Sequence, residues 1–334
     1  MFPLPNKAQK IIIAPLNWGL GHATRCIPLI RHCISQGKNV IIASDGEALE
    51  LLSDEFPDLE KIKLPAYKVK YKGKSLFSIV FSNSFNILNA IVKEHFALKT
   101  IVKEHNPDYI ISDSRFGFWS NKTHTTFITH QLSLHSKNEF FAFLLNIVNR
   151  FFLNRFQEIW VLDNNDHLLS GKLSQNVNLK NIRFIGPVSR LKKAKASIKY
   201  SLGIILSGPE PARTKLEEKL VDHLIHYKQS VILVRGTNKL SRVEYPKSWC
   251  VKNRLDAKEI NNVVLSSEKI ITRSGYTSIM DYFLLEKSAI LIPTPGQSEQ
   301  EYLAEYLDGK FGFVNINESD LKLLMPFALR PSNI

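Results

Sequence analysis

Short apolar runs alternate with amphipathic segments along most of the chain. The first apolar run, KIIIA at 10–14, is followed by a polar loop at 15–22 and an amphipathic segment at 23–36. Gly37 then separates this segment from a second apolar run, NVIIAS. Strand, helix and strand in this order are the first unit of a parallel sheet.

The same alternation continues through both halves of the chain. Further strands are predicted at Asp108–Ser112, Thr125–Thr129, Glu158–Asp163, Leu202–Ser207, 230–236, Lys269–Arg273 and Ala289–Pro293. Helices are predicted at Phe85–Lys103, Glu139–Asn154, Thr214–Tyr227 and from Thr277 onward. The helix at 139–154 has one face made of Phe141, Leu144, Leu145, Val148 and Phe152, and its spacing predicts a buried face. Strands that alternate with helices indicate an α/β protein with doubly wound parallel sheets.

The alternation is interrupted at 185–200, where Gly-Pro is followed by basic residues without apolar periodicity. We therefore predict two Rossmann-like domains, at 1–186 and 201–316, joined by a basic linker at 187–200. The remaining residues, 317–334, are predicted to form a C-terminal tail that returns to the first domain. A chain of 334 residues is long enough for two domains with separate cores.

The composition narrows the class of protein. No stretch of 18 or more uncharged apolar residues is present, which excludes a membrane-spanning helix. The first ten residues have no secretory h-region, so we expect a cytoplasmic protein. Cys26, Cys33 and Cys250 fit neither a disulfide framework nor a zinc site and are interpreted as packing residues. The net charge of +13 favours anionic partners: phosphates, nucleic acid or an anionic membrane surface.

The first loop, PLNWGLGHATR, contains the candidate residues of the first domain. Ligands of open parallel sheets bind beyond the carboxyl ends of the strands, and this loop follows the first strand. Gly19 and Gly21 allow close approach of a ligand to the backbone, although the spacing is not that of the dinucleotide motif. His22 at the start of the helix is suited to proton transfer near neutral pH, and the alternative is that it caps its own helix.

Two loops of the second domain suit a diphosphate and a sugar. In SGPEPAR, Ser207 and Gly208 precede a helix, although two prolines remove backbone donors. In TRSGYTSIMD, Ser274 and Gly275 open a helix that places Asp281 about two turns further on. A helix start binds phosphate and a carboxylate accepts two sugar hydroxyls, whereas the alternative is an N-cap with a surface acid.

A third loop of the second domain, IPTPGQSEQEYL, is dense in amides and carboxylates. Gln297, Glu299, Gln300 and Glu301 donate and accept hydrogen bonds in fixed planes, which is how proteins recognise sugar hydroxyls. The alternative is a solvated helix start.

Together these motifs resemble the GT-B nucleotide-sugar glycosyltransferases of the family 28 type, which include the murein lipid-linked N-acetylglucosaminyltransferase. The resemblance covers most of the chain and is specific at 271–307. It implies two doubly wound Rossmann-like domains that face each other across a cleft. Donor-binding roles carried over from the family fall on Ser207, Gly208, Arg213, Asp281, Gln297, Gln300 and Glu301. The loop that faces acceptor and diphosphate carries over to Gly19, Gly21 and His22.

The resemblance implies a single displacement that inverts the anomeric centre. We expect His22 to be the base, with Asp113 as second choice and His130 as third. The leaving diphosphate would be stabilised by the helix starts at Gly208 and at Ser274 and Gly275, with Arg273 or Arg213. Because the chain has no D-x-D motif, we expect neither a metal nor another cofactor beside the nucleotide sugar.

The acceptor is expected to differ from that of the murein enzyme. Where that enzyme has a His-Glu-Gln-Asn run, this chain has HQLS at 130–133. We predict that the enzyme transfers a sugar to a hydroxyl of a lipid or of a cell-envelope glycan. The resemblance implies that the sugar donor is a UDP-sugar. Basic and aromatic stretches at Lys68–Lys74, at 75–92, around Trp119 and at 138–156 would dock peripherally on an anionic membrane, or else belong to the core.

Three other functions are compatible with parts of the sequence. A nucleotide-sugar 2-epimerase would use the same donor pocket without an acceptor. A non-catalytic module would bind the nucleotide sugar or a partner. Nucleic-acid binding fits the net charge, but no nucleic-acid-binding motif is present and we do not expect it.

Overall fold

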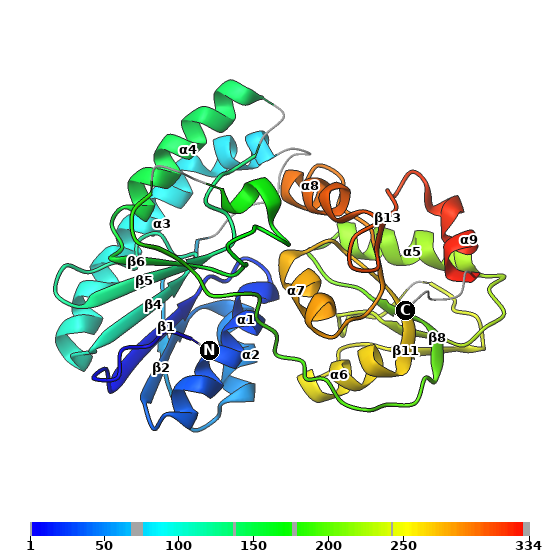
Figure 1. Cartoon of the computed structure of the whole chain (residues 1–334), viewed down its shortest axis with the longest axis horizontal. Helices are drawn as coiled ribbons and strands as arrows, with labels where there is room; N and C mark the ends of the chain where they lie inside the picture. The colour runs from blue at the N-terminus through cyan, green and yellow to red at the C-terminus, as the bar shows by residue number, and fades with distance from the viewer. Residues whose placement is uncertain (1, 68–75, 136–137, 176–178, 242, 330–334) are drawn as a thin grey trace. The chain divides into compact units, whose positions relative to one another are not determined.

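The computed structural model describes residues 2–67, 76–135, 138–175, 179–241 and 243–329, with the backbone alone at 76–84, 327 and 329. The basic stretch Lys68–Lys74 lies outside the described residues. The chain divides into two compact units, Met1–Val188 and Ser189–Ile334. Each unit is an α/β fold, as Figure 1 shows.

The first unit is built on a parallel sheet with the strand order β3-β2-β1-β4-β5-β6-β7. Its strands are β1 (Lys10–Pro15), β2 (Asn39–Ser44), β3 (Glu60–Lys63), β4 (Tyr109–Asp113), β5 (His124–Thr129), β6 (Glu158–Val161) and β7 (Ile182–Phe184). Its helices are α1 (Leu20–Ser35), α2 (Gly46–Glu55), α3 (Leu76–His105) and α4 (Glu139–Leu153), with a 3₁₀ turn η1 (Gly171–Ser174). The strand order reverses between β1 and β4, which makes the sheet doubly wound.

Alternate residues of the central strands face opposite layers of helices. Ile12 of β1 and Ile110 of β4 pack against Leu98 and Ile101 of α3. Nearly every residue of β1 and β4 is buried, as is typical of a parallel strand covered on both faces. In Figure 1, α3 and α4 cover one face of the sheet, and α1 and α2 cover the other.

The structure corrects the prediction for α4. Only Asn149 and Leu153 of this helix are buried, whereas Leu144 and Val148 of the face predicted to be buried are exposed. The reason is that α4 packs on the sheet through its last turn, where Leu153 joins the cluster around Phe127. Earlier in the helix, Phe140, Phe143, Leu144, Ile147 and Val148 are exposed, whereas Phe141 and Leu145 are half-buried.

The second unit repeats the doubly wound design, with the strand order β10-β9-β8-β11-β12-β13 and all pairs parallel. Its strands are β8 (Tyr200–Ile205), β9 (Val231–Val234), β10 (Trp249–Lys252), β11 (Ser267–Thr272), β12 (Ala289–Leu291) and β13 (Phe313–Asn315). Its helices are α5 (Ala212–Leu224), α6 (Ala257–Ser266), α7 (Tyr276–Leu284), α8 (Ser298–Leu307) and α9 (Leu324–Leu329), with a 3₁₀ turn η2 (Leu321–Leu323). The fold class predicted from the sequence is confirmed.

Both segments predicted to lie outside the second domain pack on the second unit. The backbone of Lys192 exchanges hydrogen bonds with the side chain of Asn261, at 2.9 and 3.2 Å, and Leu191 is buried. At the other end, Leu321 and Leu324 belong to the core cluster of this unit. The buried side chains of Leu321, Leu324 and Ala328 are therefore part of the core of the second unit, which places this part of the predicted tail in the second unit.

A buried ionic network joins the central elements of the first unit. The Arg115 guanidinium, fully buried, forms ion pairs with Glu94 at 2.7 Å and with Asp45. Its Nε donates to the carbonyl of Pro15 at 2.9 Å, and Tyr67 donates its hydroxyl hydrogen to Glu94 at 2.9 Å. Burial raises the pKa of Glu94, while the charge and hydrogen bond of Arg115 oppose this effect. This network fixes the end of β1, where the glycine-containing loop begins.

Replacing Arg115 with Met should destabilise the protein by about 3–5 kcal/mol, because Glu94 and Asp45 would stay buried without a countercharge. The matched control is Arg31→Met on α1, which removes a partly exposed ion pair with Glu55 and should cost less than about 1 kcal/mol. Urea unfolding of both variants measures the difference. Equal losses of stability would contradict the role assigned to the buried network.

Candidate active site

The candidate residues of the first unit gather where the strand order of the sheet reverses. β1 and β4 are neighbours, and Pro15 at the end of β1 lies opposite Asp113 at the end of β4. β5 lies beside β4, and His130 directly follows it. Because the carboxyl ends of these strands meet at one edge, side chains distant in sequence converge there.

Helix α1 begins three residues earlier than the sequence predicted. It starts at Leu20, so Gly21 and His22 lie in its first turn rather than in the preceding loop. Gly19 precedes the helix with φ of 87°, a left-handed conformation that favours glycine. The first turn has no acidic residue, and no side chain caps it. The start of α1 therefore presents backbone N–H groups and a positive dipole end to an anion.

Asp113 is the centre of this cluster and is fully buried. Its Oδ2 accepts a hydrogen bond from Nε of Arg25 at 2.6 Å, and its Oδ1 accepts one from Nη2 of the same guanidinium. Nδ1 of His22 lies 2.8 Å from Oδ1, and the thiol of Cys26 lies 3.5 Å from Oδ2. Burial by itself would raise the pKa of Asp113, but the charge of Arg25 and the hydrogen bonds from Arg25 and His22 hold it well below its usual range. Asp113 is therefore a fixed anion.

His22 has the geometry of a general base. Its side chain is 20% exposed, and its Nε2 has no hydrogen-bond partner among the described residues. Burial and the charge of Arg25 lower the pKa of His22, against the opposing effect of Asp113. The imidazole is consequently neutral at pH 7, with Nδ1 held by Asp113 and Nε2 available to accept a proton.

Arg25 connects the three catalytic candidates of the sequence. Its Nη1 lies 3.2 Å from Nδ1 of His130, which is buried, and its other nitrogens contact Asp113. The structure thus brings His22, Asp113 and His130 together. The sequence analysis did not single out Arg25, although its position three residues after His22 places both on one face of α1.

The candidate residues of the second unit also lie at the carboxyl ends of adjacent strands. Ser207 and Gly208 follow β8, and Ser274 and Gly275 follow β11, its neighbour in the sheet. Gly208 has φ of 99°, and a Cβ atom at Gly275 would meet nothing within 4 Å. Gly275 precedes α7 without a side-chain cap. A helix start without a side-chain cap suits an anion, and the binding of a diphosphate here stays a prediction.

The two arginines proposed for the diphosphate are bound to other protein groups. Arg273 is 1% exposed, pairs with Glu318 at 2.6 Å and donates to backbone carbonyls, among them that of Pro293. Arg213 pairs with Glu210 and donates to the carbonyl of Arg235 at 2.8 Å. In this structure both arginines hold loops together, and Gly208 lies four residues before the start of α5 at Ala212.

The amides and carboxylates of the third loop hold that loop in place. Gln300 accepts a hydrogen bond from the backbone N–H of Thr294 at 3.0 Å and donates to Gln297 at 2.7 Å. Glu301 accepts one from Gly296 at 2.7 Å. Ser274 donates to the backbone carbonyl of Gln300 at 2.8 Å, so the loops after β11 and β12 are linked.

Asp281 lies on α7 and is 8% exposed. The hydroxyl of Ser189 donates a hydrogen bond to its Oδ1. Burial raises the pKa of Asp281 to about 6, although Ser189 and the charge of Arg190 oppose the shift. Ser189 lies in the segment predicted as a linker, so no motif in the sequence indicated this contact.

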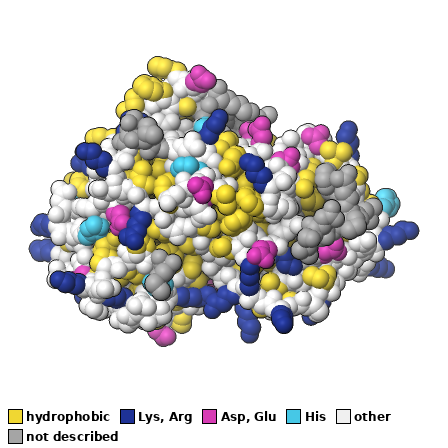
Figure 2. Space-filling model, in the orientation of Figure 1, with side chains coloured by type: hydrophobic (Ala, Val, Ile, Leu, Met, Phe, Trp, Pro, Cys, Tyr) yellow, Lys and Arg dark blue, Asp and Glu magenta, His cyan; other side chains and the backbone are white. Residues whose placement is uncertain are grey.

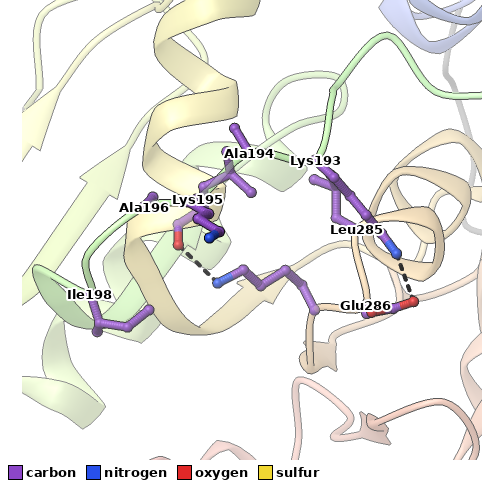
Figure 3. A pocket seen from close by; sticks show the side chains of 9 residues that line it. Lys193, Ala194, Lys195, Ala196, Ile198, Leu285 and Glu286 are labelled. Atoms are coloured by element: carbon purple, nitrogen blue, oxygen red, sulfur yellow. Dashed lines mark hydrogen bonds and ion pairs between the residues drawn. The ribbon is translucent and has the colours of Figure 1, made fainter.

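A pocket of about 490 Å³ occupies the opposite edge of the second sheet (Figure 3). Its walls come from residues 193–196 and Ile198 before β8, Leu265 before β11, and residues 285–287 before β12. Lys193 pairs with Glu286 at 2.6 Å, and Lys287 donates to the carbonyl of Leu265 at 2.9 Å. No candidate residue of the sequence lines this pocket, because those residues lie at the carboxyl ends of the strands.

No group of three or more His, Cys, Asp or Glu side chains in the described ranges could hold a metal ion. Within the same ranges, no helix has the length and apolar character needed to cross a membrane.

Comparison with known proteins identifies the second unit and the fold. Residues 213–328 match the glycosyltransferase family 28 C-terminal domain. Over 311 residues, covering 89% of this chain and 81% of the relative, the sequence is 23% identical to the UDP-N-acetylglucosamine--N-acetylmuramyl-(pentapeptide) pyrophosphoryl-undecaprenol N-acetylglucosamine transferase of Buchnera aphidicola subsp. Schizaphis graminum.

Solved structures of GT-B glycosyltransferases are similar over nearly the whole chain. The spinosyn rhamnosyltransferase SpnG complexed with thymidine diphosphate matches with a TM-score of 0.66 at 12% identity, covering 96% of this chain and 91% of that one. MurG of Acinetobacter baumannii matches with a TM-score of 0.58 at 10% identity, again covering 96% and 91%. These similarities establish the GT-B fold that the sequence motifs suggested.

Replacing Asp281 with Asn should stabilise the protein at alkaline pH more than at acid pH. A pKa raised from 3.8 to about 6 means that the native state favours the protonated carboxyl, so its contribution is complete below about pH 4 and is lost as pH rises through 6. The shift of about two units corresponds to at most about 3 kcal/mol. Thermal unfolding at pH 4.5 and pH 8 measures the effect.

The control for this prediction is Asp222→Asn, at an exposed position of α5. This variant should change the melting temperature equally at both pH values. A loss of stability in Asp281→Asn that is the same at pH 4.5 and pH 8 would contradict the buried-charge account of Asp281.

Proposed function

We propose that the protein is an inverting glycosyltransferase specific for a UDP-sugar. That it is a glycosyltransferase follows from the match of residues 213–328 to the glycosyltransferase family 28 C-terminal domain, in a chain with the GT-B fold. The acceptor in this proposal is a hydroxyl group of a lipid-linked or other cell-envelope glycan. The observation that carries the proposed chemistry is His22, a neutral imidazole held through Nδ1 by a buried carboxylate, with no partner for Nε2 in the described part of the chain.

The proposed reaction is a single displacement. Nε2 of His22 accepts the proton of the acceptor hydroxyl while the oxygen of that hydroxyl forms a bond to C1 of the sugar. The bond between C1 and the diphosphate oxygen breaks, and the electron pair leaves with the diphosphate. Attack opposite to the leaving group inverts the configuration at C1. Asp113 keeps the His22 ring oriented and stabilises the imidazolium as it forms.

The second unit supplies the donor contacts in this proposal. The uncapped start of α7 at Gly275 stabilises the negative charge of the leaving diphosphate without a metal. Asp281 accepts hydrogen bonds from the ribose, and Gln300 and Glu301 recognise the ribose and the transferred sugar. A pyrimidine nucleoside diphosphate is supported by two similar proteins: one carries UDP-N-acetylglucosamine in its name, and the other, a structural neighbour, was solved with thymidine diphosphate.

An exposed apolar surface of the first unit supports a lipid-linked acceptor. We define this surface, the α3–α4 face, by its exposed apolar residues: Phe85, Leu88, Val92 and Phe96 of α3, and Phe140, Phe143, Leu144, Ile147, Val148 and Phe151 of α4. Phe85 is 78% exposed and Phe140 71% exposed. Figure 2 shows hydrophobic side chains gathered over α4. An exposed stripe of this extent on two helices is typical of an interaction surface.

Cations border the α3–α4 face and contact its aromatic rings. Lys99 lies over the ring of Phe96 at 5.1 Å, and Arg155 lies over the ring of Phe151 at 4.6 Å. Apolar rings flanked by lysine and arginine suit the interface of an anionic bilayer. Below the same face, Ile87 of α3 and Phe152 of α4 pack against the cluster that contains Leu16 of the glycine-containing loop. Docking of this face would thus bring a lipid-linked acceptor near the loop that precedes α1 and His22.

Replacing His22 with Gln should lower kcat by roughly 10²- to 10⁴-fold, because the acceptor proton loses its base. UDP release, measured in the presence of acceptor, reports this loss. Donor binding should remain, since the proposed donor contacts lie in the second unit, and the UDP-induced rise in melting temperature should equal that of the wild type.

His32→Gln, further along the same helix, is the matched control and should retain wild-type kcat. Unchanged turnover in His22→Gln would contradict the proposed base. If no nucleotide raises the melting temperature of the wild type at millimolar concentration, the donor proposal fails. Conversion of the donor sugar without an acceptor would instead support an epimerase.

Replacing Phe143 and Phe151 together with Ser should weaken binding to phosphatidylglycerol vesicles at least about tenfold, because burying each phenylalanine side chain contributes about 1.5–3 kcal/mol. Vesicle co-sedimentation measures this binding, and vesicles of phosphatidylcholine alone should bind the wild type weakly. Leu240→Ser is the control, since Leu240 is 97% exposed on the second unit. Equal binding of all three proteins would contradict membrane docking through the α3–α4 face.

A further inference from the structure

The hydrogens of the Arg25 guanidinium fix the tautomer of His22. Nη2 carries two hydrogens, and two oxygens are within reach: Oδ1 of Asp113 and, at 3.3 Å, the hydroxyl of Ser114. Nδ1 of His22 lies 3.0 Å from Nη2 and 2.8 Å from Oδ1 of Asp113. An unprotonated Nδ1 beside a carboxylate oxygen would bring two acceptors together. Nδ1 therefore carries the hydrogen and donates it to Asp113.

The backbone after β4 is shaped to complete this arrangement. Ser114 has φ of 62°, in the left-handed region that non-glycine residues rarely adopt. This conformation follows directly after Asp113 and turns the hydroxyl of Ser114 toward Arg25. Strained backbone at a cluster of charged groups indicates that their positions are under functional constraint.

Arg25 and Asp113 form a buried ion pair with no net charge. The side chain of Arg25 is 2% exposed and that of Asp113 is fully buried. Two parallel hydrogen bonds hold the pair, one from Nε and one from Nη2. His22 therefore donates to a carboxylate whose charge is already balanced. A carboxylate without this arginine would favour the imidazolium form of its histidine partner.

We propose that Arg25 is a positioning residue that balances the charge of Asp113, so that the carboxylate orients His22 without promoting its protonation. This inference rests on the proposed role of His22 as the base. It separates two effects that a carboxylate partner ordinarily combines, namely fixing the tautomer and raising the basicity of the ring. His22 thereby stays unprotonated somewhat below neutral pH, and its imidazole has a lower proton affinity than it would have beside an unbalanced carboxylate.

The other titratable groups around His22 are accounted for in the described part of the chain. Asp113 faces it from β4, Arg25 from α1 and His130 from the residue after β5, while Cys26 of α1 contacts Asp113. Burial raises the pKa of the Cys26 thiol, which stays uncharged near neutral pH. Arg25 is thus the one permanent cation of this set, and its removal is the change that leaves Asp113 without a countercharge.

The test measures the titration of His22 directly. The ¹³Cε1–¹H signal of His22, assigned by its loss in His22→Gln, is followed by NMR between pH 4.5 and 8.5. In the wild type it should titrate below pH 6.5, and its ¹⁵N shifts should show hydrogen on Nδ1 at pH 7. In Arg25→Gln the titration of the His22–Asp113 pair should move up by at least about one pH unit.

Two variants separate charge from structure. Arg25→Lys keeps the positive charge and should leave the titration within about 0.3 pH units of the wild type, well short of the shift in Arg25→Gln. Arg31→Gln removes the same charge from the same helix at a partly exposed ion pair and should also leave it unchanged. A folded Arg25→Gln protein with an unshifted His22 signal would overturn the proposal. If that variant does not fold, a wild-type His22 that titrates at or above pH 6.5 would overturn it.

This measurement is independent of the proposed function. Failure to detect sugar transfer would remove the base role of His22 without altering the titration. Where transfer is detected, the acid limb of kcat/KM should shift in Arg25→Gln by the same number of pH units as the NMR signal. An equal loss of kcat/KM at all pH values would indicate a purely structural role and would overturn the proposal.

Discussion

The buried carboxylate of Asp113 is the constraint on which the first unit's candidate site depends. A charged group without solvent needs a countercharge and hydrogen-bond donors, and α1 supplies both through Arg25 and His22. The convergence is possible because β1 and β4 are neighbours at the point where the strand order reverses. The helix that follows β1 therefore begins beside the end of β4, and its first turn faces the carboxylate.

A second buried arginine, Arg115, fixes the backbone at the end of β1, next to this site. Arg115, two residues after Asp113, bonds to the carbonyl of Pro15 and pairs with Glu94 of α3. The backbone N–H of Leu16 in turn donates to the carbonyl of Asp113 at 2.9 Å. The loop between β1 and α1 is consequently held at its base by both β4 and α3. A base whose orientation must be reproducible benefits from a loop that is fixed in this way.

The second unit follows a different physical logic. Its candidate side chains are engaged with one another, so that Gln300 and Glu301 hold the loop after β12 and Ser189 holds Asp281. Asp281 differs from these side chains, because burial raises its pKa and disfavours its ionised form even though Ser189 donates a hydrogen bond to it. A ligand hydroxyl would provide this carboxylate with a further hydrogen-bond donor. A buried carboxylate that is unfavourable until a ligand binds is typical of binding sites.

The sequence by itself determined the alternating strands and helices, the two doubly wound units and the loops at the carboxyl ends of the strands. Period-two and helical patterns report local structure, and parallel sheets place their loops by a general rule. His22, Asp113 and the residues of the second-unit loops were identified in this way. Their roles in binding and catalysis stay predictions.

Only the tertiary structure decided which side chains meet and which apolar surfaces stay exposed. Asp113 and Arg25 are 88 residues apart, and Ser189 and Asp281 are 92 apart, so no local pattern could indicate either contact. The helical spacing of α4 predicted an apolar face but not what covers it, and the fold leaves Leu144 and Val148 exposed. Periodicity shows that a helix has an apolar face, whereas burial depends on the elements that the complete fold packs against it.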